Sequence, residues 1–167
     1  MTSFTYAIVV VSDRGSRGER EDKSAPVVRD LLERIGGKIA GYKVVPDELE
    51  EIREAILQWT EGARRVDLVL TCGGTGVHPR DVTPEATRGV IQREVPGIPE
   101  AMRAASLSKT PHAVLSRGIA GVKDTTLIIN LPGSPKAAKE NLEAILVAIP
   151  HALEKIQGDP SECGSQG

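Results

Sequence analysis

The sequence predicts an α/β fold: a three-layer, doubly wound and mostly parallel sheet with helices on both faces. Short apolar runs alternate along the chain with segments of helical periodicity, and such alternation is typical of βαβ units. Polar, glycine-containing loops follow several of the apolar runs. Hydrophobic residues make up 40% of the 167 residues and aromatic residues only 2%, so the core between the layers must be aliphatic.

Five short apolar segments predict the strands. Most are rich in β-branched side chains, which suit strands that are buried on both faces. The expected strands are Tyr6–Val11, Ile39–Val45, Val66–Thr71, Ala113–Ser116 and Thr125–Leu131. Four loops follow strands and begin at Ser12, Asp47, Gly73 and Asn130. Because open α/β sheets bind ligands beyond the carboxyl ends of their strands, we expect these loops to lie near one crevice.

The helices are predicted by periodic apolar stripes and by residues that favour the N-cap position. The expected N-cap residues are Ser24, Asp47, Thr83 and Ser134. Asp47 and Glu50 together form a capping-box sequence. A further helix is expected at Pro99–Leu107, and Pro150 is expected to interrupt the last helix.

Composition and charge exclude several classes of protein. The net charge is −2, from 21 basic and 23 acidic side chains, which argues against a nucleic-acid partner. The N-terminus lacks a signal-peptide pattern and no apolar run approaches the roughly 20 residues that span a bilayer, so we expect a cytoplasmic protein without a membrane partner. Two cysteines and three histidines are scattered and show no metal-site spacing. We expect one domain over residues 1–158 and a flexible tail over 159–167.

The glycine-rich segment Gly73–Gly76 follows the third expected strand. Glycines let the backbone adopt positive φ angles and approach a ligand closely. Successive backbone N–H groups can then form an anion-binding nest. The segment matches neither a Walker A loop nor the GxGxxG fingerprint. The residues alone therefore leave phosphate binding and a plain strand–helix connection equally open.

Asp47 and Asp81 are two acids in loops that we expect at the same crevice. Each carboxylate taken alone is explained as a stabiliser of a helix N-terminus. Together they match the one or two carboxylates that Mg²⁺ takes alongside substrate phosphates. Phosphoryl-type transfer needs positioning and charge neutralisation more than a protein nucleophile, and the sequence shows no nucleophile-and-base pattern.

Three further polar segments lie at expected strand ends. Ser12 and Asp13 can orient ligand groups or merely shape a turn. The junction 130–135 can bind an anion at a helix N-terminus, although turn chemistry and capping explain every residue in it except Asn130. Ser116 and Arg117 add one hydroxyl and one cation. They too can bind a ligand or have a purely structural role.

The ordered motifs of the chain resemble one known family, the MogA/MoaB family of molybdenum-cofactor biosynthesis. In chain order they are SDRGSRGEREDKSAP, VPDE, TCGGTGVHPRDVTPEAT, VPGIPEAMR, LSRGIAG and LIINLPGSPKAAKE. The resemblance extends from about Tyr6 to Gly158. It implies a molybdopterin adenylyltransferase with ATP and molybdopterin as substrates. Such an enzyme transfers AMP from ATP to the molybdopterin phosphate and releases pyrophosphate, with Mg²⁺ shared among the nucleotide phosphates.

The resemblance also implies roles for individual residues. Asp47 and Asp81 match the family's two essential acids, and are therefore the expected catalytic and metal-binding residues. The expected nucleotide- and pterin-binding residues are Ser12, Asp13, Gly73, Gly74, Thr75, Gly76, Ser116, Asn130, Pro132 and Gly133. Cys72 stands where relatives often have threonine, and no role transfers to His78.

The family is typically trimeric, so a homotrimer is implied, and a molybdate-insertion protein of the MoeA type is the implied protein partner. The INLPGSPKAAKE ending looks closer to MogA than to MoaB. Two alternatives stay open. One is a molybdopterin-binding carrier or scaffold without catalysis, and the other is a flavodoxin-like binding module suggested by fold class alone.

Overall fold

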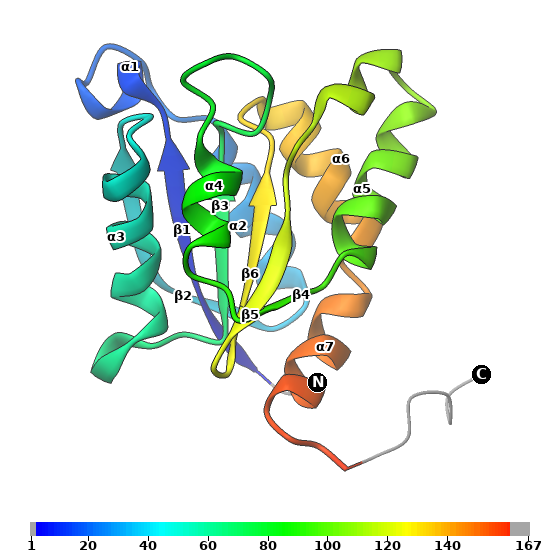
Figure 1. Cartoon of the computed structure of the whole chain (residues 1–167). Helices are drawn as coiled ribbons and strands as arrows, with labels where there is room; N and C mark the ends of the chain where they lie inside the picture. Colours follow the sequence, from blue (N-terminus) through cyan, green and yellow to red (C-terminus); the bar gives the residue numbers. More distant parts are fainter. Residues whose placement is uncertain (1–2, 161–167) are drawn as a thin grey trace.

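The computed structural model describes residues 3–160, which build a six-stranded sheet in the order β2-β1-β3-β6-β5-β4. The strands are β1 Phe4–Val11, β2 Gly37–Val45, β3 Leu68–Cys72, β4 Arg93–Glu94, β5 Ala120–Lys123 and β6 Thr126–Leu131. Neighbours from β2 to β6 pair in parallel, whereas β5 pairs antiparallel with both β6 and β4. The predicted mostly parallel sheet is confirmed, and the carboxyl ends of its parallel strands lie at one edge (Figure 1).

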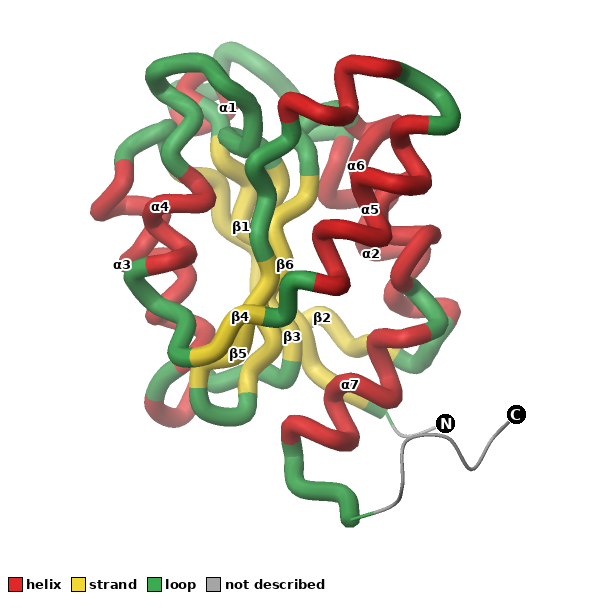
Figure 2. The backbone as a smooth tube through the Cα atoms, turned by 45° about the vertical axis from the view of Figure 1, so that its right-hand side comes forward, coloured by secondary structure: helices red, strands yellow, loops and turns green. Residues whose placement is uncertain are grey.

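Helices cover both faces of the sheet. The α-helices are α1 Asp13–Ser16, α2 Ser24–Arg34, α3 Leu49–Thr60, α4 Thr83–Arg88, α5 Gly97–Leu107, α6 Pro135–Ile145 and α7 Ala148–Ile156. Two short 3₁₀ helices are η1 Gly62–Arg64 and η2 Pro111–Leu115. Figure 2 shows α3 and α4 on one side of the sheet and α2, α5, α6 and α7 on the other, which gives the three expected layers. Among residues 3–160, no helix combines the length and the apolar character needed to cross a bilayer.

Strand β1 shows how the sequence builds two aliphatic cores at once. Successive side chains of a strand point to opposite faces. Tyr6, Ile8 and Val10 belong to the core beneath α2 and α6, whereas Val9 and Val11 belong to the core beneath α3. All of these side chains are at most 5% exposed. Burial of one such aliphatic side chain stabilises the fold by roughly 1.5–3 kcal/mol, so the uninterrupted apolar run is explained by its two covered faces.

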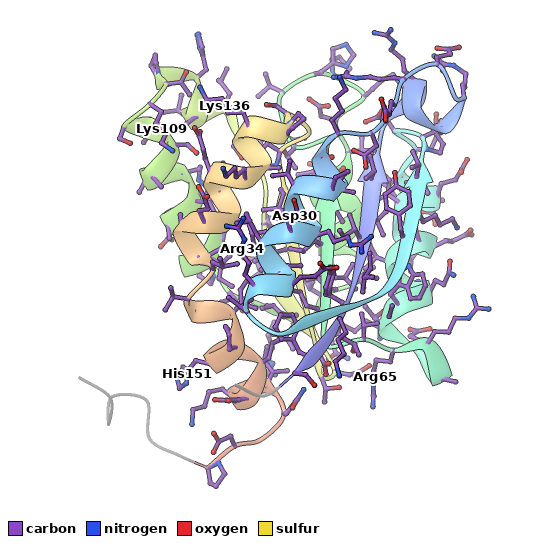
Figure 3. All side chains as sticks on the ribbon, turned by 180° about the vertical axis from the view of Figure 1, so that it is seen from behind. Asp30, Arg34, Arg65, Lys109, Lys136 and His151 are labelled. Carbon is purple, nitrogen blue, oxygen red and sulfur yellow. The ribbon has the colours of Figure 1, made fainter. Side chains whose placement is uncertain are left out.

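The outer surface of the larger helical layer is charged. Seen from behind in Figure 3, α2 and α6 lie side by side over the sheet, with Asp30 and Arg34 on α2. Lys136 stands in the first turn of α6, and Lys109 follows the end of α5 (Figure 3). The Lys109 ammonium forms an ion pair with Glu140 of α6 at 3.3 Å. This face therefore keeps its apolar stripe toward the sheet and its charges toward solvent.

The expected strand at Ala113–Ser116 is wrong. This segment lies largely in η2, and its apolar side chains Val114 and Leu115 are 63% and 47% exposed. The sheet instead gains β5, which forms a tight hairpin with β6 through Asp124 at φ 51°. Strand β5 could not be predicted because its four residues, AGVK, form too short a pattern.

The two predicted serine caps differ from each other in the structure. Ser134 accepts a hydrogen bond from the Ala137 N–H at 3.3 Å, so the predicted cap of α6 is confirmed. Ser24 is not the N-cap of α2. The Asp22 carboxylate accepts from the Ser24 N–H at 2.9 Å and also from the Ser24 hydroxyl at 2.7 Å, because aspartate offers acceptors without a competing donor.

Asp47 and Thr83 are also not N-caps. Helix α3 begins at Leu49 without a side-chain cap, and the Asp47 carboxylate accepts instead from the Asp13 N–H at 2.9 Å. Thr83 is the first residue of α4, and its hydroxyl donates to the Gly73 carbonyl at 2.8 Å. In both cases a tertiary contact at the carboxyl edge of the sheet replaces the local cap.

The interruption of the last helix is confirmed but lies before the proline. Helix α6 ends at Ile145 and α7 begins at Ala148, so Pro150 stands in the first turn of α7. A proline clashes with the carbonyl four residues earlier, here that of Leu146, which explains why the break falls there. Of the expected tail over 159–167, residues 161–167 lie outside the described residues, and the domain boundary stays a prediction.

Candidate functional site

A cavity of about 790 Å³ opens at the carboxyl edge of the sheet. It is bordered by Ser12 after β1, Asp47 after β2, the turn 72–74 after β3 and the start of α6 at 133–135. Residues 20–24 also line it. All four loops expected at one crevice therefore meet there, at the edge beyond the β1 and β6 arrowheads in Figure 1, although the fourth begins after Leu131 rather than at Asn130.

The glycine-rich turn adopts a backbone that only glycine accommodates. Gly73 and Gly74 have φ angles of 111° and 65°. A Cβ on Gly73 would collide with the Val11 carbonyl oxygen, and one on Gly74 would collide with the Thr83 hydroxyl. A Cβ on Gly133 would lie 3.2 Å from the Gly73 Cα. The turn is thus packed tightly between β1, α4 and the loop before α6.

Thr83 holds the first two carbonyls of this turn. Its hydroxyl donates to the Gly73 oxygen at 2.8 Å and its backbone N–H donates to the Gly74 oxygen at 3.1 Å. The Thr83 side chain is fully buried, so both bonds are shielded from competing water. The RDVTPE motif therefore contributes a threonine that fixes the turn, in addition to its acid.

Arg117 holds the next two carbonyls. Its backbone N–H donates to the Thr75 oxygen at 2.8 Å and its Nε donates to the Gly76 oxygen at 2.7 Å. Its Nη2 donates to the Asp81 carbonyl at 2.6 Å, and its Nη1 pairs with the Glu85 carboxylate. One arginine therefore ties the turn to the segment that carries Asp81.

The amide groups of the turn are left available. All four carbonyls of Gly73–Gly76 accept hydrogen bonds from Thr83 or Arg117. The N–H groups of residues 74–76, in contrast, find no acceptor within residues 3–160. Successive N–H groups of this kind form a concavity that binds phosphate or another anion.

Asp13 and Asp47 bind each other's backbone. The Asp47 Oδ2 accepts from the Asp13 N–H at 2.9 Å, and the Asp13 Oδ1 accepts from the Asp47 N–H at 3.0 Å. Arg80 donates to both Asp13 oxygens, at 2.6 and 2.9 Å, and to Glu48 at 2.9 Å. The arginine, followed by the Asp47 amide, lowers the pKa of Asp13 to about 2.

Asp47 has the opposite electrostatic environment. Burial raises its pKa, and the negative charges of Asp13 and Asp81 raise it further. The Asp13 N–H and Arg80 act in the other direction without offsetting these effects. Asp47 is therefore a cavity-facing carboxylate that lacks a matching cation among the described side chains close to it, a setting that favours binding of an added cation.

Asp81 lies in the segment between the glycine turn and α4. Its Oδ2 accepts from the His78 N–H at 3.0 Å, and a Cβ on Gly76 would lie 2.8 Å from that oxygen. A Cβ on Gly74 would lie 3.3 Å from the Asp47 Oδ1. The two acids thus flank one turn and sense each other's charge, although only Asp47 borders the cavity.

Asn130 and Ser116 stand apart from the cavity wall. Asn130 lies inside β6 rather than at the start of a loop, and is only 1% exposed. Its Nδ2 donates to the Thr71 and Thr87 hydroxyls at 2.9 and 2.8 Å, and its Oδ1 accepts from the Ile119 N–H at 3.2 Å. Its side-chain amide is therefore committed to joining β6 to β3 and α4. Ser116 and Pro132 likewise do not border the cavity.

The partners of the charged residues could not be predicted from the sequence. Arg80 and Arg117 were visible beside motifs, but their acceptors lie 32 to 67 positions away in the chain. Asp22, which accepts from Ser24 at the start of α2, also accepts from the Tyr42 hydroxyl at 3.0 Å and so anchors the cavity loop to β2. No local pattern could reveal these pairings, because each depends on the strand order.

The chain matches the model of a family described as "Probable molybdopterin binding domain" over residues 7–151. It belongs to this family. The molybdopterin biosynthesis enzyme MoaB of Thermus thermophilus has the same fold, with a TM-score of 0.87 and 50% identity, covering 95% of this chain and 99% of that one. The resemblance to the MogA/MoaB family inferred from the motifs is thus confirmed.

Two curated relatives connect the family to named proteins. Gephyrin of Dictyostelium discoideum is 48% identical over 167 residues, which cover 94% of this chain. The chain spans only 23% of gephyrin's length. The molybdopterin adenylyltransferase of Helicobacter pylori J99 is 40% identical over 161 residues, which cover 95% of this chain and 91% of the relative.

Proposed function

We propose that this chain is a molybdopterin adenylyltransferase, which transfers AMP from ATP to the phosphate of molybdopterin and releases pyrophosphate. One observation carries the proposal: the unpaired N–H groups of residues 74–76 lie in a glycine turn, and the Asp47 carboxylate, which has no matching cation close to it, stands beside that turn. An anion-binding nest beside a carboxylate that lacks a paired cation suits a nucleoside triphosphate bound with a divalent ion. The molybdopterin adenylyltransferase of Helicobacter pylori aligns with nearly the whole chain.

The reaction needs no nucleophile from the protein. An oxygen of the molybdopterin phosphate attacks the α-phosphorus of ATP, a new phosphoanhydride bond forms, and the bond to the bridging oxygen of the β-phosphate breaks. Pyrophosphate leaves with the electron pair of that bond. The amides of residues 74–76 stabilise negative charge on the nucleotide phosphates, and the rigid turn keeps the reacting groups in line.

Asp47 and Asp81 are the residues that would hold Mg²⁺. The described residues contain no group of three or more His, Cys, Asp or Glu side chains arranged as a metal site. This agrees with Mg²⁺, which is held by one or two carboxylates and otherwise by water and substrate phosphates. The raised pKa of Asp47 supports this placement, because a cation beside the carboxylate would stabilise its charged form. When bound, Mg²⁺ would neutralise charge on the triphosphate.

The other expected binding residues divide by position. Ser12, Gly73, Gly74 and Gly133 border the cavity and are proposed to contact nucleotide or pterin. Thr75 and Gly76 lie next to that wall and are proposed to offer their backbone N–H groups to the nucleotide phosphates. Asp13, Ser116, Asn130 and Pro132 lie behind or beside the wall and are proposed to shape it. The homotrimer, a MoeA-like partner for molybdate insertion and a cytoplasmic location are proposed from the family alone.

Pyrophosphate release tests the proposed function. Purified chain is incubated with molybdopterin, ATP and Mg²⁺, and matched reactions omit each component in turn. The expected result is release that requires all three. Tight molybdopterin binding without ATP-dependent release would instead identify a carrier or scaffold, and would refute the adenylyltransferase proposal.

A further inference from the structure

Arg117 lies in the segment between η2 and β5, outside every strand and helix, yet it contacts the turn at several points. The backbone N–H of Arg117 binds the Thr75 oxygen, and its Nε and Nη2 bind the carbonyl oxygens of Gly76 and Asp81. The three donor–acceptor distances lie between 2.6 and 2.8 Å. One residue therefore links the anion nest to the backbone that carries the second acid.

Glu85 fixes the orientation of this guanidinium. The Glu85 carboxylate pairs with Nη1 and also accepts from Nη2 at 3.4 Å. The hydrogen bond to Arg117 lowers the pKa of Glu85, and the same bond raises the pKa of Arg117. A planar guanidinium held by a carboxylate presents its remaining N–H groups in fixed directions, here toward the Gly76 and Asp81 carbonyls.

We infer that Arg117 is a positioning residue that sets the turn Gly73–Gly76 and Asp81 in their working arrangement, an inference that rests on the proposed function. By engaging the carbonyls of residues 75 and 76, Arg117 keeps their lone pairs away from the phosphate site. The amides are then the polar groups left to face an anion. Arg117 acts through the backbone and is not placed in contact with the substrates.

Lysine at position 117 is the critical substitution. It keeps the positive charge but replaces the planar fork with one tetrahedral ammonium, which cannot reproduce the divergent bonds to Gly76, Asp81 and Glu85. Arg88→Lys is the matched control, since Arg88 also belongs to this region but forms its ion pair with the exposed Glu94, at 3.3 Å. The control keeps the charge and the type of substitution the same, at an arginine that makes no contact with the turn.

Two measurements on the full chain test the inference. In the first, pyrophosphate release is followed for wild type, Arg117→Lys, Arg117→Ala and Arg88→Lys. Misplacement of reacting groups by about 1 Å can cost about 100-fold in rate. We expect a fall in kcat of about that size for both Arg117 variants, with a smaller change in the KM for molybdopterin and wild-type kinetics for Arg88→Lys.

The second measurement is amide hydrogen exchange without substrates. The Asp81 and Thr83 amides donate to the His78 and Gly74 carbonyls, at 2.8 and 3.1 Å. We expect both to exchange faster in Arg117→Ala while amides of β1 and β3 stay unchanged. This readout does not depend on adenylyl transfer, so it decides the inference even where wild type releases no pyrophosphate and the proposed function fails.

Each remaining outcome overturns the inference. If the wild-type chain is active and Arg117→Lys has the same kcat, the guanidinium group does not position the glycine turn and Asp81. Unchanged exchange at Asp81 and Thr83 in Arg117→Ala would show that the turn holds its shape alone. Faster exchange spread through β1 and β3 would show a general stabilising role instead.

Discussion

Asp13 and Asp47 lie two residues beyond the ends of the paired strands β1 and β2, and each binds the other's backbone amide. Their carboxylates differ in every other respect. Arg80 donates hydrogen bonds to both carboxylate oxygens of Asp13 and lowers the pKa of Asp13 to about 2. Asp47 borders the cavity, and burial raises its pKa.

At this strand pair, one acid therefore has a structural role and the other is available for binding and catalysis. Asp13 has its charge compensated by Arg80, so it acts mainly as a fixed acceptor for the Asp47 amide. Asp47 keeps an uncompensated charge next to Gly74, where a cation and phosphates are proposed to bind. Sequence alone gives both acids the same local description, a carboxylate shortly after an apolar strand.

The largest expected effect is that of Asp47→Asn. Asparagine keeps an oxygen that can accept from the Asp13 N–H but removes the charge, so we expect pyrophosphate release to fall by about 100-fold or more. The melting temperature should not drop, since a disfavoured buried charge is removed. Steady-state kinetics and thermal unfolding check both parts. Wild-type turnover by this variant would refute the assignment of Asp47.

Asp13→Asn should reduce activity less, by about tenfold, and should lower stability. Arg80 loses a charge-assisted bidentate partner, and such partly exposed bonds contribute about 1 kcal/mol. Denaturant unfolding measures the loss of stability, and the same pyrophosphate assay measures activity. A larger loss of activity in Asp13→Asn than in Asp47→Asn would reverse the proposed division between the two acids.

Arg80→Gln should shift the pH profile. Without the guanidinium, the Asp13 charge is no longer offset, and its repulsion raises the pKa of Asp47 further. The acid limb of the activity profile should therefore move to higher pH, while activity well above that limb changes little. An unchanged acid limb would show that Asp47 does not control the activity at low pH.

The smallest expected effect is on stability in acid. The depressed pKa of Asp13 contributes stability that is present above its unfolded pKa, near 3.9, and is lost as pH falls toward about 2. Asp47, with a raised pKa, contributes in the opposite sense, because its protonation relieves the folded state. Melting curves from pH 5 to pH 2 should therefore fall less steeply for Asp13→Asn and more steeply for Asp47→Asn. Parallel curves for all three proteins would contradict both pKa directions.

Patterns that are complete within a short segment could be predicted from the sequence. The run Tyr6–Val11 gave β1 because six adjacent apolar residues suit a strand covered on both faces. Ser134 gave a true cap because its acceptor geometry is local to α6. The alternation of such segments was enough to predict the layered fold and to bring Ser12, Asp47 and Gly73 to one edge of the sheet.

Features that depend on distant partners could not be predicted in this way. Asp47 and Thr83 look like caps, but the folded chain offers them the Asp13 amide and the Gly73 carbonyl instead. The strand β5 needs β6 as its partner, and its own four residues carry little signal. The hydrogen bond from Arg117 to the Gly76 carbonyl joins residues that are 41 positions apart in the chain. These contacts arise only once the sheet order is fixed.

The central claim, that Asp47 is the uncompensated carboxylate of the pair, is tested most directly by a carboxyl ¹³C NMR titration of the full chain. We predict that Asp13 titrates near pH 2, that Asp47 titrates above its ordinary value of 3.8, and that Mg²⁺ with ATP lowers the midpoint of Asp47 but not that of Asp13. An Asp47 midpoint at or below that of Asp13, or one that Mg²⁺ and ATP leave unmoved, would contradict the account.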